Sequence, residues 1–218
     1  MTTDQYPLLI FDWDGTLMDS ISHIVDSLQH AMHVTGVEVL SRAQSGDIIG
    51  LGMREAIVAL FPNYAQDEKF IGQFTESYQR YYLEHSTATH LFEGAEETLI
   101  SLKNIGYTLA IATGKGRKGL DHVLAQTGLA PLFAASRCAS ETQSKPHPEM
   151  INTVLDDTGF GHEQAIMIGD TEYDLQMATN AGVISIGASY GVHTSERLKQ
   201  HNPKAIIQQI TELTNLLA

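Results

Sequence analysis

The chain has 218 residues, of which 43% are hydrophobic, enough for one sizeable core or for one core and a smaller module. Its 26 acidic residues outnumber 13 Lys and Arg, and the formal net charge of −13 argues against general binding to nucleic acids or anionic membranes. No apolar run approaches the roughly 20 residues needed to span a bilayer. The one cysteine, Cys138, excludes an intrachain disulfide, and the first residues lack the basic region of a signal peptide, so a cytoplasmic location is expected.

Short apolar runs alternate with longer amphipathic segments along the chain. Four of the runs are apolar almost throughout, which is typical of parallel strands that are covered on both faces. Strands are predicted at 7–12, 107–113, 132–136, 164–169 and 183–188, and helices at 95–105, 117–127, 147–158, 173–181 and 208–217. The alternation predicts an α/β fold with a doubly wound parallel sheet.

The stretch from residue 18 to about residue 90 breaks this alternation, because it has helical periodicity and no convincing strand. A helical block between the first and second strands predicts an inserted all-helical module. The domains are therefore expected at 1–17 and 91–218 for the α/β core and at 18–90 for a helical cap. One continuous domain with several crossover helices is the alternative.

Two acids, Asp12 and Asp14, follow the first predicted strand in the sequence FDWDGTL. Side chains alternate along a strand, so both carboxylates are expected on the same side. Like charges so close repel each other unless a cation lies between them. A plain strand and turn is the alternative, since Asp-Gly is a common turn dipeptide.

Polar residues also follow three further predicted strands, and ligands bind at the carboxyl ends of strands in open α/β sheets. These residues are Thr113 and Gly114, Lys145 in SKPHP, and Asp170 and Asp174 in GDTEYD. Taken singly, each has a plain explanation: a turn, a solvated loop lysine, or a helix N-cap. Together they offer oxygen ligands for a hard cation, a hydroxyl donor, a lysine, and glycines that let backbone N–H groups approach an anion. This set suits phosphoryl transfer, in which catalysis is mostly positioning and charge neutralisation.

The four motifs DWDGT, TG, K145-P and GDTEYD, in this order and at these distances, resemble those of the haloacid dehalogenase superfamily. Within it, the chain is most similar to the phosphoglycolate-phosphatase-like phosphatases, and the resemblance covers nearly the whole chain. It implies a Rossmann-like core with a helical cap and a Mg²⁺-dependent phosphatase that works through an aspartyl phosphate.

The resemblance also implies a role for each motif residue. Asp12 would be the nucleophile and Asp14 the acid and base, while Thr113 would bind phosphate and Lys145 would neutralise charge. Mg²⁺ would be held by the Asp12 side chain, the Asp14 backbone carbonyl and the Asp170 side chain. Asp174 would position Lys145 or lie behind the metal ligands.

Substrate binding is expected from Thr16, Gly114 and Arg54. Arg54 follows two glycines in GDIIGLGMREA, which permit close backbone approach, although an exposed arginine paired with a nearby acid is the alternative. Gly114 departs from the family, in which Asn or Ser is common at this position. Glu93 stands where a Pro often precedes the glycine.

The function expected is hydrolysis of a small-molecule phosphate monoester, with phosphoglycolate as the default substrate. The alternatives are a phosphomutase acting on a sugar phosphate and a catalytically silent binding protein. The chain is expected to act as a monomer or homodimer, without nucleic-acid or membrane partners.

Overall fold

A parallel β-sheet forms the centre of the molecule. The computed structural model describes residues 1–85 and 90–217, and within them the sheet has six strands in the order β5-β4-β1-β6-β7-β8. The strands are β1 (Leu8–Phe11), β4 (Thr108–Thr113), β5 (Phe133–Cys138), β6 (Ala165–Gly169), β7 (Ile184–Ala188) and β8 (Ala205–Ile207). The central strand β1 pairs in parallel with β4 and with β6. The predicted α/β fold with a doubly wound parallel sheet is confirmed.

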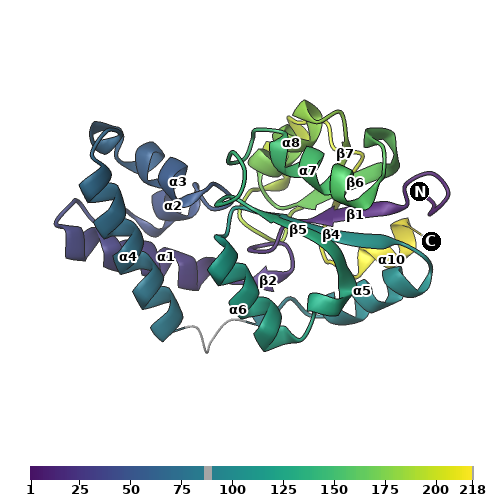
Figure 1. Cartoon of the computed structure of the whole chain (residues 1–218), viewed down its shortest axis with the longest axis horizontal. Helices are drawn as coiled ribbons and strands as arrows, with labels where there is room; N and C mark the ends of the chain where they lie inside the picture. The colour runs from purple at the N-terminus through teal and green to yellow at the C-terminus, as the bar shows by residue number, and fades with distance from the viewer. Residues whose placement is uncertain (86–89, 218) are drawn as a thin grey trace.

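Helices cover both faces of the sheet (Figure 1), as its nearly continuous apolar strands require. Leu9 and Phe11 of β1 belong to the same buried cluster as apolar side chains of α5, α6 and α10, while Leu8 and Ile10 belong to a second cluster with α7 and α8. These helices are α5 (Ala95–Asn104), α6 (Arg117–Thr127), α7 (Glu149–Thr158), α8 (Glu172–Asn180) and α10 (Glu212–Leu216). No helix in the described ranges is long and apolar enough to cross a membrane.

The C-terminal part of the sheet differs from the sequence prediction. Strand β8, which pairs in parallel with β7, and the five-residue helix α9 (Ser195–Lys199) were not predicted. The helix predicted at 208–217 is limited to Glu212–Leu216. An edge strand of three residues is too short to leave a readable hydrophobic period, which explains why it was missed.

Four helices between β1 and β4 form the cap, which lies beside the sheet at the left of Figure 1. They are α1 (Ile21–Thr35), α2 (Arg42–Gly46), α3 (Met53–Leu60) and α4 (Glu68–Glu84), with a short 3₁₀ helix at Pro62–Tyr64. Leu28, Met32, Ile57 and Phe74 share a buried apolar cluster of the cap. The cap therefore has a core of its own, and the predicted insertion of a helical module is confirmed.

A two-stranded antiparallel pair joins the cap to the sheet domain. Strands β2 (Met18–Asp19) and β3 (His90–Leu91) lie at the two chain crossings, with Met18 opposite Leu91. The expectation of no strand between residues 18 and 90 was wrong at this point. Two residues are too few to show the alternation of apolar and polar side chains by which a strand is predicted.

Candidate active site

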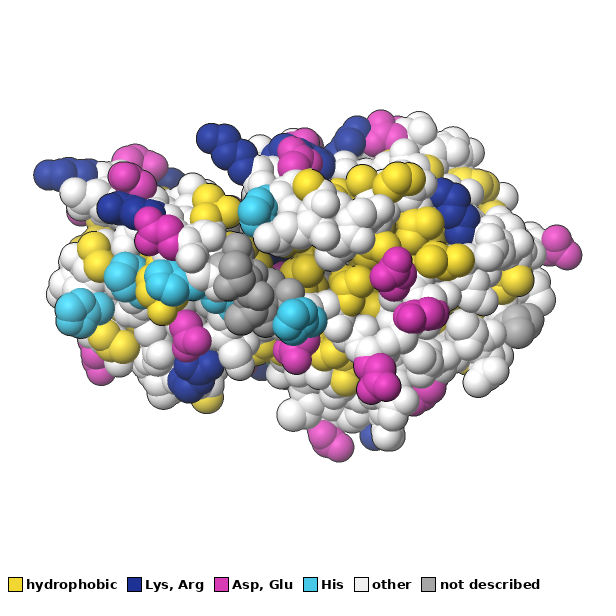
Figure 2. Space-filling model, turned by 90° about the horizontal axis from the view of Figure 1, so that it is seen from below, with side chains coloured by type: hydrophobic (Ala, Val, Ile, Leu, Met, Phe, Trp, Pro, Cys, Tyr) yellow, Lys and Arg dark blue, Asp and Glu magenta, His cyan; other side chains and the backbone are white. Residues whose placement is uncertain are grey.

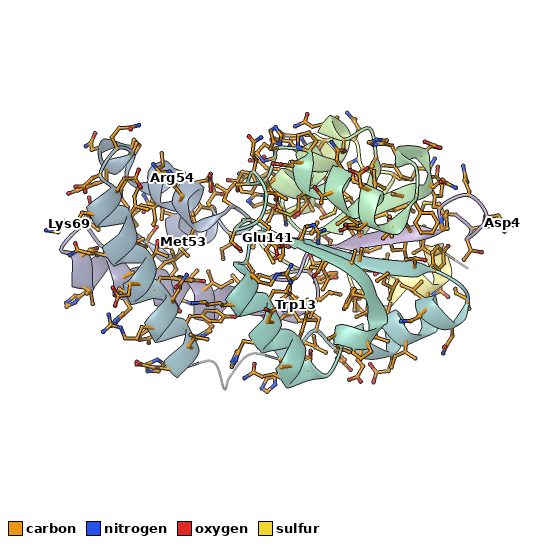
Figure 3. The ribbon with its side chains drawn as sticks, in the orientation of Figure 1. Asp4, Trp13, Met53, Arg54, Lys69 and Glu141 are labelled. Atoms are coloured by element: carbon orange, nitrogen blue, oxygen red, sulfur yellow. The ribbon has the colours of Figure 1, made fainter. Side chains whose placement is uncertain are left out.

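The first acid of the site, Asp12, lies directly after the central strand β1. Its backbone N–H donates to the carbonyl of Ile168 at 2.9 Å, which extends the pairing with β6 by one residue. Trp13 is completely buried in the core below the sheet (Figure 3), while the Asp12 carboxylate is 1% exposed and lines the cavity between cap and core. The alternation of a strand thus separates the chemistry of Asp12 from the packing of Trp13.

Lys145 joins two of the acids. Its Nζ lies 2.8 Å from Asp12 Oδ1 and 2.7 Å from Asp174 Oδ1, and all three side chains are buried. Burial lowers the pKa of Lys145, but the charges of Asp12 and Asp174 outweigh it and raise that pKa above its ordinary value. The ammonium group is therefore kept charged, next to the carboxylate that the resemblance makes the nucleophile.

Asp174 is held from its other side by the start of α8. Its Oδ2 accepts hydrogen bonds from the backbone N–H and the hydroxyl of Thr171, at 3.1 and 2.7 Å. Thr171 in turn caps the helix through the Asp174 N–H, so the two residues form a capping box. Gly169 is needed beneath them, since an added Cβ would lie 2.3 Å from Asp174 Cγ. Asp174 is thus held where it contacts Lys145, an arrangement that suits one of its two expected roles.

Asp170 completes a group of three buried acids. Asp12, Asp170 and Asp174 each place a carboxylate oxygen within 4.8 Å of the others. Asp170 Oδ1 accepts a hydrogen bond from Thr16 Oγ1 at 2.8 Å, and Oδ2 accepts one from the Val192 N–H at 2.8 Å. The Thr16 hydroxyl thus contacts an acid of the site, and its expected contact with substrate stays a prediction.

The electrostatics of these acids fit a bound divalent cation. Burial raises the pKa of Asp12 to about 7 against the lowering effect of Lys145, and burial with the charges of Asp12 and Asp174 raises the pKa of Asp170 well above its ordinary value. Asp12 Oδ2 has no hydrogen-bond partner among the described residues. A cation would relieve the repulsion and occupy this free oxygen. Asp174 is already paired with the Lys145 ammonium, whereas Asp170 has no cationic partner among the described residues, so Asp12 and Asp170 are the better side-chain ligands.

Asp14 has a cation of its own. Its Oδ1 accepts a 2.6 Å hydrogen bond from Ser20 Oγ, and its Oδ2 lies 3.0 Å from Lys115 Nζ. Lys115 also donates to the hydroxyl of Tyr82 at 3.2 Å and lies 4.6 Å from the centre of that ring. Asp12 and Asp14, adjacent to one strand, are therefore served by different lysines.

Lys115 was not predicted as a site residue. It is 7% exposed at its side chain, and it connects an acid of the core to a tyrosine of the cap helix α4. Its place two residues after Thr113, at the end of a buried strand, is a signal that sequence reasoning could have used.

The cap loop 47–52 packs closely on the ends of the core strands. Gly114 follows β4, and an added Cβ there would lie 2.4 Å from the carbonyl oxygen of Gly50. The N–H of Gly52 donates to Ser144 Oγ at 2.7 Å. Thr113 is buried at the end of β4, where its Oγ1 accepts a hydrogen bond from the Lys115 N–H at 3.2 Å. The absence of a side chain at position 114 thus lets two backbones meet.

A second cap–core contact surrounds Asp47, which sequence reasoning did not single out. Its carbonyl oxygen accepts a 3.1 Å hydrogen bond from the hydroxyl of Tyr173, and its carboxylate pairs with Arg197. Arg197 also pairs with Glu172 at 2.6 Å, which holds the pKa of that carboxyl at about 2. This network ties the cap to the start of α8, the helix that carries Asp174.

Arg54 lies apart from the acids. It pairs with Glu68 through contacts of 2.6 and 2.7 Å, its side chain is 44% exposed, and it contributes to the wall of the cavity from the start of α3 (Figure 3). The structure thus brings together every predicted motif residue and leaves Arg54 with an acidic partner in the cap.

Asp12, Asp14, Thr113, Gly114 and Lys115 open into a cavity of about 840 Å³ between the cap and the core. Its far wall comes from cap helices α1, α3 and α4. A volume of this size is typical of sites for small organic ligands. The acids, lysines and cavity together form a site in which a ligand can meet the buried Asp12 carboxylate.

Comparison with known proteins agrees with this geometry. Residues 9–188 match the model of the haloacid dehalogenase-like hydrolases. The chain is 33% identical to a Dickeya dadantii protein named "Probable phosphatase IndB", with 95% of this chain and 91% of that one covered. It is 27% identical to a phosphoglycolate phosphatase of Vibrio parahaemolyticus, with 100% and 99% covered. A solved Bacteroides fragilis structure, described as a "Putative haloacid dehalogenase-like hydrolase", superposes with a TM-score of 0.89 at 25% identity, with 96% of this chain and 100% of that one covered.

Proposed function

The chain belongs to the haloacid dehalogenase-like hydrolases and is a phosphatase of that family, and we propose that it hydrolyses a small-molecule phosphate monoester with Mg²⁺ and through an aspartyl phosphate on Asp12. One observation carries the proposal. A buried carboxylate at the end of the central strand lines the cavity, with one oxygen 2.8 Å from a lysine ammonium and the other free of hydrogen bonds and so available to the metal. Such a group is positioned to attack an electrophile in the cavity.

In the first step, an Asp12 oxygen forms a bond to phosphorus, and the bond from phosphorus to the ester oxygen breaks. The departing oxygen takes a proton from Asp14, and the free alcohol leaves. Lys145 neutralises the negative charge of the Asp12 carboxylate and of the phosphoryl group that approaches it, and Thr113 with the N–H of Gly114 binds the phosphoryl oxygens.

In the second step, Asp14 accepts a proton from water, whose oxygen bonds to phosphorus while the bond to Asp12 breaks. Inorganic phosphate leaves, and Asp12 and Asp14 return to their starting states. Asp14 suits this exchange because Ser20 and Lys115 hold one oxygen each at 2.6 and 3.0 Å, which fixes the orientation of the carboxyl group. A carboxylate nucleophile divides one difficult displacement into two easier ones.

The metal proposed is Mg²⁺, held by the side chains of Asp12 and Asp170 and the backbone carbonyl of Asp14. When bound, it supplies positive charge to the phosphoryl oxygens and to the acids that surround them. Thr16 keeps Asp170 in place through its 2.8 Å hydrogen bond, while Asp174 remains with Lys145.

The partner proposed is a small molecule, with phosphoglycolate as the reference substrate because relatives carry that name. On the face drawn in Figure 2, basic side chains stand singly or beside acidic ones and form no continuous basic patch, which suits a small ligand better than a nucleic acid. We further propose residues 18–90 as the cap domain, and a cytoplasmic monomer or homodimer. The buried free thiol of Cys138 suits a reducing compartment.

Release of inorganic phosphate tests the proposal. The purified chain, stripped with EDTA and dialysed, is assayed against a panel of phosphate monoesters with and without added Mg²⁺. We expect one phosphate for each ester consumed, loss of turnover without metal, and recovery on adding Mg²⁺. Ca²⁺ should not restore turnover, since it accepts more ligands in looser geometry. Full turnover of the stripped chain would remove the metal from the proposal, and conversion of a sugar phosphate without free phosphate would identify a mutase.

A further inference from the structure

The cavity above Asp12 is much larger than a glycolate leaving group. It measures about 840 Å³, which lies in the upper part of the range for sites that enclose drug-sized ligands. Glycolate has two carbons and two functional groups, so it would leave most of this space to water. The size of the cavity therefore indicates a larger alcohol.

The wall that faces Asp12 and Asp14 from the cap is mostly apolar. It is built by side chains from α1, α3 and α4 and from the loop 47–52, including Leu28, Ile49, Met53, Ile71 and Tyr78. All five are buried or half-buried. Such side chains stabilise a ligand by removing apolar surface from water and offer no partner for a desolvated charge, while Thr75 and Gln79 add uncharged polar groups to the same wall.

The cations around the cavity are engaged with acids. Among the described residues that line it there are four Lys and Arg, and three have carboxylate partners: Arg54 with Glu68, Lys115 with Asp14, and Arg117 with Glu141. The fourth, Lys118, is exposed. A second negative charge on the substrate would therefore have to displace an existing ion pair or stay near the solvent.

We propose that the natural substrate is a phosphate monoester of a large, uncharged, ring-bearing alcohol that fills the apolar part of this cavity, rather than the ester of a small acid such as glycolate. The proposal deepens the phosphatase function and rests on it. The phosphoryl group binds at the strand ends, and the cap wall selects the alcohol.

Three esters separate the effects of size and charge. Ethyl phosphate and 2-phenylethyl phosphate release alcohols of similar acidity, so their difference reports binding of the phenyl group, while 2-phosphoglycolate adds a carboxylate to a two-carbon frame. Burying one methylene group changes a binding constant roughly fourfold. We therefore expect kcat/KM for 2-phenylethyl phosphate to exceed that for ethyl phosphate by roughly 10- to 100-fold. We expect 2-phosphoglycolate to be no better than ethyl phosphate. A higher kcat/KM for 2-phosphoglycolate than for 2-phenylethyl phosphate would overturn the proposal.

A matched pair of variants locates the preference. Met53 lines the cavity, while Val58 on the same helix packs on the cap core without lining it. In Met53→Ala the ratio of kcat/KM between 2-phenylethyl and ethyl phosphate should fall about threefold to tenfold, and in Val58→Ala it should stay unchanged. Because both values of kcat/KM are measured on the same variant, a loss of folded protein lowers both equally and leaves their ratio unchanged. Equal ratios in both variants and the parent chain would show that the cap wall does not bind the alcohol.

Binding separates a failure of this inference from a failure of the phosphatase function. The same three esters are titrated calorimetrically into Asp12→Asn, whose cavity keeps its apolar wall. If the parent chain releases phosphate but prefers 2-phosphoglycolate, the substrate class is wrong and the function stands. If no ester is hydrolysed, the function fails, and tighter binding of 2-phenylethyl phosphate than of ethyl phosphate or 2-phosphoglycolate would still support the cavity assignment, while equal or reversed binding would overturn it.

Discussion

The core and the cap handle charge in opposite ways. In the core, Asp12, Lys145 and Asp174 are buried and joined by contacts of 2.7 and 2.8 Å. In the cap, Arg54 and Glu68 pair at the surface, and the wall that faces the site is apolar. Buried charges need partners, whereas exposed pairs contribute little to stability or binding. The comparison teaches that the paired charges of the core suit the proposed reaction, while the mostly apolar wall of the cap suits the proposed selection of the leaving group.

The two parts also meet through backbone rather than through side chains alone. Gly50 contacts Gly114 closely, and the Gly52 N–H donates to Ser144. Side chains add to these contacts, because the Lys115 ammonium group reaches both Asp14 and Tyr82, and Arg197 pairs with Asp47. Lys115 therefore links the cap helix α4 to Asp14, the acid proposed to transfer protons.

The largest effect is expected from the two acids of the first motif. Asp12→Asn should abolish turnover and leave no phosphate on the protein, since an amide is a poor nucleophile. Asp14→Asn should be slower by about 10²–10⁴-fold, the range for loss of a general acid or base, and should accumulate phosphorylated protein with an activated ester. Intact-mass spectrometry after acid quench measures both.

Asp4→Asn is the matched control for these variants, since Figure 3 shows Asp4 at the end of the molecule opposite the cap. It should retain full activity. Phosphate on Asp12→Asn and none on Asp14→Asn would exchange the two roles. An absence of label from both variants with every activated ester would favour direct attack by water.

The next effect concerns the link between core and cap. Lys115→Met removes the cation beside Asp14, and hydrogen bonds to charged groups are worth about 1.5–3 kcal/mol, so we expect kcat/KM to fall by roughly 10- to 100-fold. Lys69→Met is the matched control, because Lys69 is exposed on the cap helix α4 and does not line the cavity. It should stay within about twofold of the parent chain. Similar losses in both variants would show that the Lys115–Asp14 contact does not serve the reaction.

A smaller loss is expected where the two backbones meet. An added Cβ at Gly114 would lie 2.4 Å from the Gly50 carbonyl oxygen, whereas at Gly116 nothing lies within 4 Å of it. Gly114→Ala should therefore push the cap loop outward and reduce kcat/KM by about tenfold, since small misplacements at a reacting centre are costly. Gly116→Ala should leave kcat/KM unchanged. If both variants match the parent chain, the contact at Gly50 plays no part in closing the site.

The fold was predictable from the sequence where apolar runs were long enough to show. The uninterrupted runs at β1, β4, β6 and β7 identified the central strands, because parallel strands are buried on both faces. Strand β8 and the β2–β3 pair were missed because two or three residues carry no measurable period. Their positions depend on which backbone N–H and carbonyl groups the longer strands leave without a hydrogen-bond partner.

The site was predictable to the extent that it follows strand ends. The carboxyl ends of neighbouring strands carry Asp12, Thr113 and Asp170. These strand ends lie side by side in the sheet, whichever conformation the loops adopt. Partners across the cap–core contact were not predictable in this way. Lys115 reaches Tyr82, and Asp47 reaches Arg197, only because the cap closes on the core. Local patterns hold no information about which residues face each other across such a contact.

The smallest effect is expected at Arg54, the cap residue that the sequence favoured for substrate binding. Its guanidinium already pairs with Glu68 at a largely solvent-exposed site, and such pairs are worth about 0–1 kcal/mol, so Arg54→Gln should change kcat/KM by less than about threefold. Arg42→Gln is the matched control, because Arg42 is also an exposed cap arginine paired with an acid, Asp26, and does not line the cavity. Both variants are assayed with 2-phosphoglycolate and with 2-phenylethyl phosphate. A large loss in Arg54→Gln confined to 2-phosphoglycolate would show that the arginine leaves Glu68 to bind a carboxylate, and the cap would then recognise charge after all. Equal, small changes with both esters would support recognition of the alcohol by the apolar side chains of the wall.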